Sequence, residues 1–106
     1  MENKLSRWAK YTEFSGEGKT IVPVAIKKLC PPETDTMNPK FLDKEGCTLR
    51  LVFKDMDNGE VERWYENSFP SFKWAITNQK VEKNKEYQVS LNKEHEGKWK
   101  WQFTKL

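Results

Sequence analysis

Apolar and polar residues alternate over four short stretches of the chain, as they do in β-strands that bury one face. This pattern predicts strands over roughly 47–54, 60–66, 85–92 and 98–105, and a further strand is expected over 20–29. This further segment, TIVPVAIKKL, is rich in β-branched residues, and Pro23 places its first half at a sheet edge or at a bulge. We therefore expect a fold made mainly of β-strands.

The clearest local signal is CTLRLVFKDMDNGEVERWYE, in which DNG separates two alternating runs and marks a β-hairpin. Two registers are open. A three-residue loop with Gly59 in the left-handed region places Trp64 opposite Val52, on the outer face. A two-residue turn instead places Trp64 opposite Phe53, in the core.

We prefer the first register because of the charges that it brings together. It pairs opposite charges across the two strands, Lys54 with Glu62 and Arg50 with Glu66. The same register leaves Arg63 on the inner side, where its long side chain must reach the mouth of a barrel.

The segment SFPSFKWAITNQ predicts a short helix. Pro70 suits the first turn of a helix, and Phe69, Phe72 and Ile76 recur at three- and four-residue spacing. Trp74 lies one residue off this apolar stripe. It is either a core residue at a barrel rim or a contact for a ligand or partner, and burial statistics favour the core.

Two other segments have no single pattern. CPPETDTMNPKFLDKEG holds three prolines and predicts a long irregular loop, of the kind that is usually functional or disordered. Residues 1–18 form an N-terminal arm or an extra edge element. In that segment Leu5, Trp8 and Tyr11 have helical spacing, whereas an overlapping stretch alternates like an edge strand.

The closing stretch GKWKWQFTKL places Trp99, Trp101 and Phe103 on one face of a strand and Lys98 and Lys100 on the other. The aromatic face is the better candidate for burial. We expect Trp99 and Phe103 in the core, and Trp101 remains a candidate for ligand contact. The lysines then face solvent or phosphate.

The order of strand, long loop, hairpin, short helix and hairpin resembles the OB-fold. EYQVSLNKEHEGKWKWQFTKL also resembles the last hairpin of small phage and prokaryotic single-stranded DNA-binding proteins, where a charged turn and a Gly-Lys lead into an aromatic strand. The resemblance implies a single all-β domain over 1–106 with one short helix. Its five strands would form an OB-like Greek-key barrel, with the helix between strands 3 and 4.

The resemblance also implies a ligand, namely a single strand of nucleic acid, with DNA favoured. The strand would lie across the second and third β-strands, between loops 30–46 and 93–97. Bases stack on aromatic rings while Lys and Arg follow the phosphates, with little sequence preference. The expected contacts are a platform of Trp64, Arg50 and Lys54, a basic track of Lys98 and Lys100, and Trp101, with Phe41 or Lys40 closing over the strand. Glu62, Glu66 and the acidic PPETD segment oppose a polyanion.

Composition limits the alternatives. The formal net charge is +3, so a polyanion would be met by a local patch rather than by bulk charge. No stretch is apolar enough to cross a membrane and the first residues lack a signal-peptide run, so we expect a cytoplasmic protein without membrane contact. Cys30 and Cys47 lack the spacing of a zinc site, and we expect buried free thiols; a disulfide across the loop that they bracket is the alternative.

Nothing in the sequence indicates catalysis. GEGKT lacks the first glycine of a phosphate-binding loop, DMDNGE lacks the terminal glutamate of a calcium loop, and His95 is expected to be solvated on a polar turn. We expect a non-enzyme without cofactor or metal. The alternative function is a protein-interaction module that docks on a larger partner through exposed aromatic residues. The sequence leaves the oligomeric state and the choice between DNA and RNA open.

Overall fold

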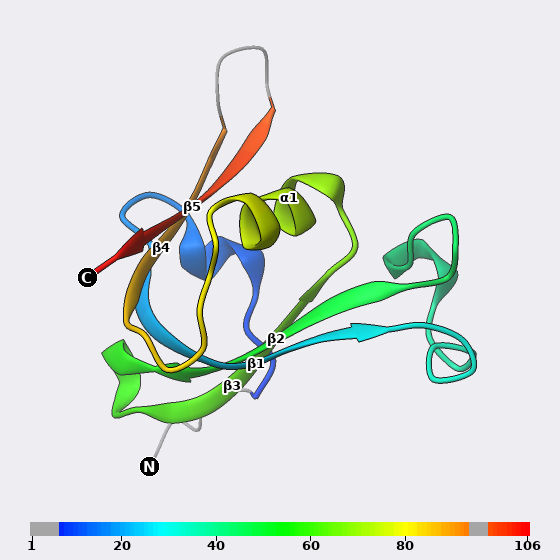
Figure 1. Ribbon diagram of the computed structural model, residues 1–106, viewed down its shortest axis with the longest axis horizontal. Coiled ribbons are helices and arrows are strands. Elements are labelled where there is room, and N and C mark those ends of the chain that lie inside the picture. The colour runs from blue at the N-terminus through cyan, green and yellow to red at the C-terminus, as the bar shows by residue number, and fades with distance from the viewer. Residues whose placement is uncertain (1–6, 94–97) are drawn as a thin grey trace.

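The computed structural model describes residues 7–93 and 98–106, which form one five-stranded antiparallel sheet with a short helix (Figure 1). The strands are β1 (Lys19–Leu29), β2 (Thr48–Asp55), β3 (Val61–Asn67), β4 (Tyr87–Lys93) and β5 (Trp99–Lys105). The helix is α1 (Pro70–Asn78), and the single turns of 3-10 helix are η1 (Tyr11–Phe14), η2 (Pro39–Phe41) and η3 (Met56–Asn58). Each predicted strand is present, and the helix follows the third strand with Pro70 in its first turn, as predicted.

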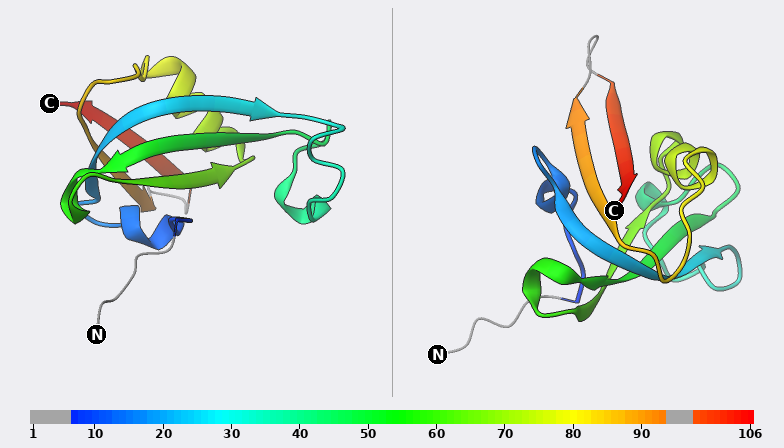
Figure 2. Two further views of the ribbon diagram at one scale, coloured as in Figure 1. Left: turned by 90° about the horizontal axis from the view of Figure 1, so that it is seen from below. Right: turned by 60° about the vertical axis from the view of Figure 1, so that its left-hand side comes forward.

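The sheet has the order β3-β2-β1-β4-β5 and is open, so that β3 and β5 are its edges. Figure 2 shows that the sheet curls strongly, with α1 beside β5. Gln79, at the end of α1, covers the edge of β5: its Nε2 donates to the Trp101 carbonyl (2.8 Å), and its Oε1 accepts from the Phe103 amide (2.7 Å). A side chain therefore occupies a place where a neighbouring strand would pair, and a closed Greek-key barrel stays a prediction.

The β2–β3 hairpin has the register that the charges favoured. Trp64 lies opposite Val52 on the outer face, and the two charged pairs also lie opposite each other, Lys54 with Glu62 and Arg50 with Glu66. Gly59 adopts the predicted left-handed conformation (φ 71°), and the turn also includes η3. The outer position of Trp64 is therefore confirmed.

Pro23 marks a bulge, which is one of the two roles expected for it. The pairing of β1 with β2 shifts register between Pro23 and Ala25. The Pro23 carbonyl accepts a hydrogen bond from the Asn84 amide (2.7 Å), in the connection between α1 and β4.

The core is built largely from aromatic rings. Phe14 from η1 is fully buried and meets the rings of Phe53, Tyr65 and Trp101 edge-on, at 5.2 to 6.1 Å between centroids. Phe72 of α1 packs 5.0 Å from the Trp101 ring. The N-terminal segment is thus fixed to the sheet by a core residue.

Two of the aromatic residues expected in the core are exposed. Trp101 and Phe103 are buried, but the side chain of Trp99 is 46% exposed, because it lies at the first position of β5 beyond the end of the core. Trp74 is 55% exposed because it faces away from the buried Phe72 and Ile76 on α1. The prediction of a core position was wrong for Trp74 and for Trp99.

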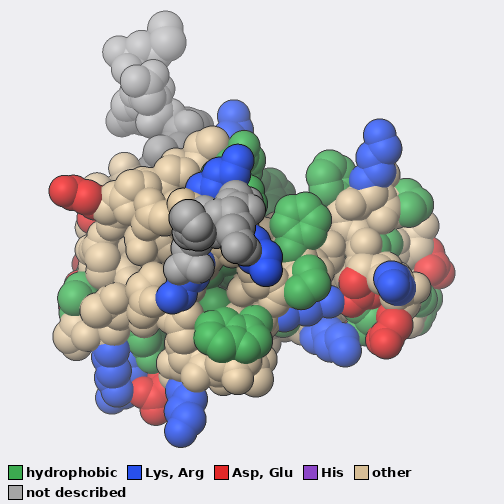
Figure 3. Space-filling model, turned by 90° about the horizontal axis from the view of Figure 1, so that it is seen from above, with side chains coloured by type: hydrophobic (Ala, Val, Ile, Leu, Met, Phe, Trp, Pro, Cys, Tyr) green, Lys and Arg blue, Asp and Glu red, His purple; other side chains and the backbone are tan. Residues whose placement is uncertain are grey.

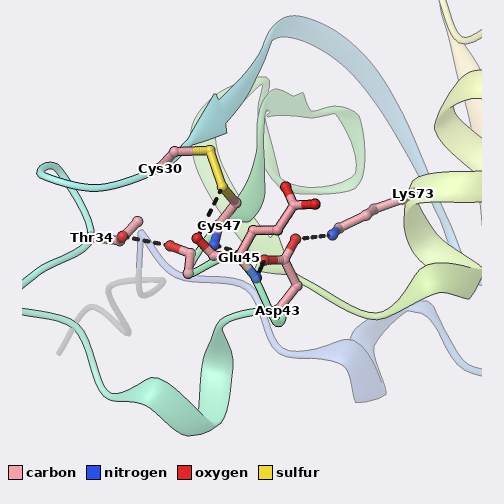
Figure 4. The surroundings of a disulfide bond; sticks show 7 residues. Cys30, Thr34, Asp43, Glu45, Cys47 and Lys73 are labelled. Carbon is pink, nitrogen blue, oxygen red and sulfur yellow. Dashed lines mark hydrogen bonds and ion pairs between the residues drawn. A yellow bond between two sulfur atoms is a disulfide. The ribbon is translucent and has the colours of Figure 1, made fainter.

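Cys30 and Cys47 form a disulfide, so the prediction of free thiols was wrong (Figure 4). The β1–β2 ladder ends at the pair Leu29 and Thr48, so the cysteines are the next residues on each strand, with Cα atoms 4.2 Å apart.

The loop that this disulfide closes is tied down by polar contacts (Figure 4). Thr34 donates from Oγ1 to the Gly46 carbonyl (2.6 Å), and Asp43 accepts at Oδ1 from the Cys47 amide (2.8 Å). Lys73 of α1 donates to Asp43 Oδ2 (2.5 Å), and this bond lowers the pKa of Asp43 to about 2. The predicted long irregular loop is therefore an ordered one.

Arg63 does not reach out to a barrel mouth but is buried in an ion cluster with Glu13, Lys19 and Asp55. Asp55 Oδ2 accepts from Lys19 Nζ (2.6 Å) and from Arg63 Nη1 (3.0 Å), and Glu13 binds the same two cations. Hydrogen bonding to Arg63 lowers the pKa of Glu13 to about 2. Burial acts to raise the pKa of Asp55, but its hydrogen bonds, that from Lys19 foremost, keep it below the usual value. The cluster fixes η1 to the sheet.

Two further expectations concern membrane-spanning helices and the turn before β5. Among the helices of the described residues, none is long and apolar enough to cross a membrane. The predicted turn at Glu96-Gly97 and the solvated His95 lie outside the described residues.

Candidate nucleic-acid interface

The N-terminal segment adds a short parallel bridge to the edge of β3. The Trp64 amide donates to the Arg7 carbonyl (2.7 Å), and the Ala9 amide donates to the Trp64 carbonyl (2.8 Å). Trp8 is therefore the bridge partner of Trp64. The bridge places two tryptophans from distant parts of the chain side by side.

Two arginines lie over these tryptophan rings. The rings of Trp8 and Trp64 meet edge-on, with centroids 5.4 Å apart and an interplanar angle of 85°. The Arg50 guanidinium carbon lies 5.2 Å from the Trp8 centroid and 4.9 Å from the Trp64 centroid. The Arg7 guanidinium carbon lies 5.0 Å from the Trp64 centroid. These distances are within the range of cation–π attraction, and we call the four residues the Trp8–Trp64 patch.

Glu66 orients Arg50 within this patch. Glu66 Oε1 accepts from Arg50 Nε (2.7 Å), and both side chains are about four-fifths buried. In the part of the chain that the structure describes, the two terminal nitrogens of Arg50 have no hydrogen-bond partner. A guanidinium held by Nε still has terminal donors that fit phosphate oxygens.

The two tryptophans differ in exposure. Trp8 is 42% exposed, whereas Trp64 is partly buried, and its buried Nε1 has no hydrogen-bond partner among the described residues. Trp8 is therefore the ring that can stack on a base, and Trp64 supports it from behind. Trp8 and Arg7 were not among the predicted site residues. The signal for them was the alternation of an edge strand in the N-terminal segment.

Other cations share the outer face of β1 and β2. Lys54 is exposed opposite Glu62 and has no ion pair with a described residue. Lys27 of β1, which was not a predicted contact, is exposed and lies directly opposite Arg50. The face that holds the Trp8–Trp64 patch is thus basic in spite of its two glutamates.

The remaining predicted contacts do not meet at this patch. Lys98 and Lys100 are exposed at β5, on the opposite edge of the sheet from β3. Phe41 and Lys40 are exposed in η2, within the disulfide-closed loop that extends beyond the Leu29–Thr48 end of β1 and β2 (Figure 1). Trp101 is 2% exposed among core rings, so its predicted contact with a ligand does not fit its position.

The described residues contain no group of three or more His, Cys, Asp or Glu side chains placed to hold a metal ion. Comparisons of the chain with protein-family models, with curated proteins and with solved structures give no significant match. The resemblance to OB-fold single-stranded DNA-binding proteins therefore stays a prediction from the sequence.

Proposed function

We propose that the protein binds single-stranded nucleic acid, DNA in preference, on the outer face of β2 and β3, without catalysis. The observation that carries the proposal is the position of the Arg50 guanidinium over the rings of both Trp8 and Trp64. Aromatic rings and cations are the two components of single-strand sites, and here they occupy one surface. The strand order, with α1 between β3 and β4, supports an OB-like arrangement as part of this proposal.

The proposed mechanism combines stacking with neutralisation of phosphates. A base stacks on the exposed ring of Trp8, and Arg7 and Arg50 contact the adjacent phosphates. Lys27 and Lys54 extend the basic surface along β1 and β2. Since every base has an aromatic face, this mode of binding gives low sequence specificity.

Charge on this face favours a polyanion. Four cations lie on it and two carboxylates oppose them, which leaves a local charge of +2; the cations are Arg7, Lys27, Arg50 and Lys54, and the carboxylates are Glu62 and Glu66. Glu66 forms an ion pair with Arg50, so the repulsion between its carboxylate and a phosphate is partly screened.

The substitution Trp8→Ala tests the proposal. Stacking on one aromatic ring contributes about 1 to 3 kcal/mol, so affinity for a dT oligonucleotide should fall roughly 5- to 150-fold. Trp74→Ala is the matched control, because Trp74 is 55% exposed on α1 and lies apart from the patch. Fluorescence anisotropy of a labelled oligonucleotide measures both affinities. If the two variants bind equally well, the Trp8–Trp64 patch is not the binding site.

Exposed aromatic residues outside the patch favour the alternative function, docking on a larger protein. Phe69 is 65% and Trp74 55% exposed, at the start of α1 and within it. Figure 3 shows hydrophobic side chains gathered among lysines and arginines on one face of the molecule. Docking through such rings would depend weakly on salt, whereas binding of phosphates weakens steeply as salt rises.

A further inference from the structure

A second aromatic pair lies where η1 meets the β4–β5 hairpin. The rings of Tyr11 and Trp99 meet edge-on, with centroids 6.2 Å apart and an interplanar angle of 75°. Tyr11 is 52% and Trp99 46% exposed. Lys93 Nζ lies 5.9 Å from the Trp99 centroid. Like the Trp8–Trp64 patch, this pair combines aromatic rings with a cation.

The N-terminal segment connects the two aromatic pairs. Trp8 bridges β3 and Tyr11 contacts the first residue of β5, so residues 8 and 11 lie beside the two edge strands of the sheet. Three residues of chain span at most about 11 Å, which limits the separation of these two positions. Lys10, between them, is exposed. Aromatic and basic side chains therefore continue from one pair to the other.

The position of Tyr11 is fixed before any ligand arrives. Phe14, in the same single turn of helix, is fully buried in the aromatic core. Glu13 of that turn binds Arg63 and Lys19 in the ion cluster. A site whose side chains are held in place loses less conformational entropy when it binds.

We infer that Tyr11, Trp99 and Lys93 form a second stacking subsite for the nucleic-acid strand that contacts the Trp8–Trp64 patch. The strand crosses residues 8–11 between the two sheet edges, with bases on both aromatic pairs. This inference rests on the proposed function and extends it. Lys98 and Lys100 alternate with Trp99 along the chain, so their side chains lie on the opposite face of β5 from the Trp99 ring. Lys93, which lies opposite Trp99 on β4, therefore supplies the positive charge of this subsite.

The dependence of affinity on oligonucleotide length distinguishes a protein with one stacking subsite from a protein with two. Single-strand sites on such domains cover roughly 4 to 16 nucleotides, so dT oligonucleotides of about 4 and about 12 nucleotides test the two cases. Wild-type affinity should rise steeply between the two lengths, because the second contact becomes intramolecular. Trp99→Ala should lower the affinity for the longer oligonucleotide about tenfold and leave most of the affinity for the shorter one. Tyr11→Ala, a change on the other ring, should have the same effect.

Two control pairs make the test specific. Trp74→Ala removes a tryptophan of similar exposure outside the path, and Lys83→Ala removes the same charge as Lys93→Ala from the exposed connection between α1 and β4. We expect losses from the Lys93 variant and near-wild-type binding by both controls. If Trp99→Ala matches Trp74→Ala on the longer oligonucleotide while Trp8→Ala weakens binding, the second subsite is wrong and the proposed function stands. If the wild type binds neither oligonucleotide, both are wrong.

Discussion

Trp8 and Trp64 lie in register on neighbouring segments, and their rings meet edge-on with centroids 5.4 Å apart. The contact depends on two backbone hydrogen bonds between the N-terminal segment and β3. One tryptophan comes from before the first strand and the other from the third strand, so the surface exists only in the folded chain. Arg50 from β2 then lies over both rings.

Acid should unfold the protein by protonating the buried ion cluster. The pKa values of Glu13 and Asp55 are below their ordinary values in the folded state, and that of Glu13 falls from 4.5 to about 2. Glu13 therefore contributes stability at neutral pH that is lost as the pH falls from about 5 through about 2, and Asp55 contributes stability that is lost as the pH falls through its own lowered pKa. Urea unfolding across that range measures the loss.

The substitution Glu13→Gln provides the control for acid unfolding. It should lower the free energy of unfolding at neutral pH and flatten its dependence between about pH 5 and 2. Asp55→Asn should cost about 3 kcal/mol at neutral pH, since it leaves Lys19 and Arg63 buried with less compensating charge. An unchanged pH profile in the Gln variant would contradict the role given to Glu13.

Reduction of the disulfide should destabilise the fold without abolishing the sheet. Cys30 and Cys47 are 17 positions apart, and a closed loop of this size contributes about 3 kcal/mol through the entropy of the unfolded chain. Urea unfolding with and without dithiothreitol measures the difference. The double variant with serine at both positions should have the stability of the reduced protein and should not respond to dithiothreitol. If dithiothreitol leaves the stability of the wild type unchanged as well, the disulfide does not contribute to it.

Gly18→Ala should be among the most destabilising single substitutions. Gly18 has φ 78°, and a Cβ atom there would lie 1.8 Å from the Val89 carbonyl oxygen of β4. Gly16→Ala is the matched control, because Gly16 has φ 73° with open space around it. The control should lose only about 1 to 2 kcal/mol from its left-handed backbone. Thermal unfolding of both variants tests whether the close approach of β4 adds a larger cost.

Gln79→Ala should uncover the edge of β5. The substitution removes both hydrogen bonds to Trp101 and Phe103, at a cost of about 1 to 3 kcal/mol, and exposes strand edge to other copies of the chain. Asn78→Ala is the control, because among the described residues the Asn78 side chain bonds only within the helix, to the Trp74 carbonyl. Light scattering and urea unfolding measure the two effects, and equal behaviour of the variants would contradict the role of Gln79.

The local pattern predicted the strands and the hairpin register because both depend on neighbours in sequence. Alternation marked four of the strands and β-branched residues marked the first, and the turn around Gly59 with its flanking charges determined the face of Trp64. Alternation also placed Trp99 on the face of Trp101, but it does not show where the core ends. Trp99 is exposed for that reason.

Contacts between distant segments were missed. The pairing of Cys30 with Cys47 follows from the β1–β2 register, and a long loop between two strands carries no turn that specifies this register. The bridge of Trp8 to Trp64 requires that the N-terminal segment cover the edge of β3. No local pattern encodes which segment covers an open edge.

The central claim is that the protein binds single strands through tryptophan and phosphate contacts. Tryptophan fluorescence should be titrated with unlabelled dT oligonucleotide and with duplex DNA, at about 50 and about 300 mM salt. Two to three phosphate contacts predict quenching by the single strand, with affinity about tenfold or more weaker at the higher salt and little response to duplex. Absence of quenching at both salt concentrations, or equal affinity at both, would contradict the claim.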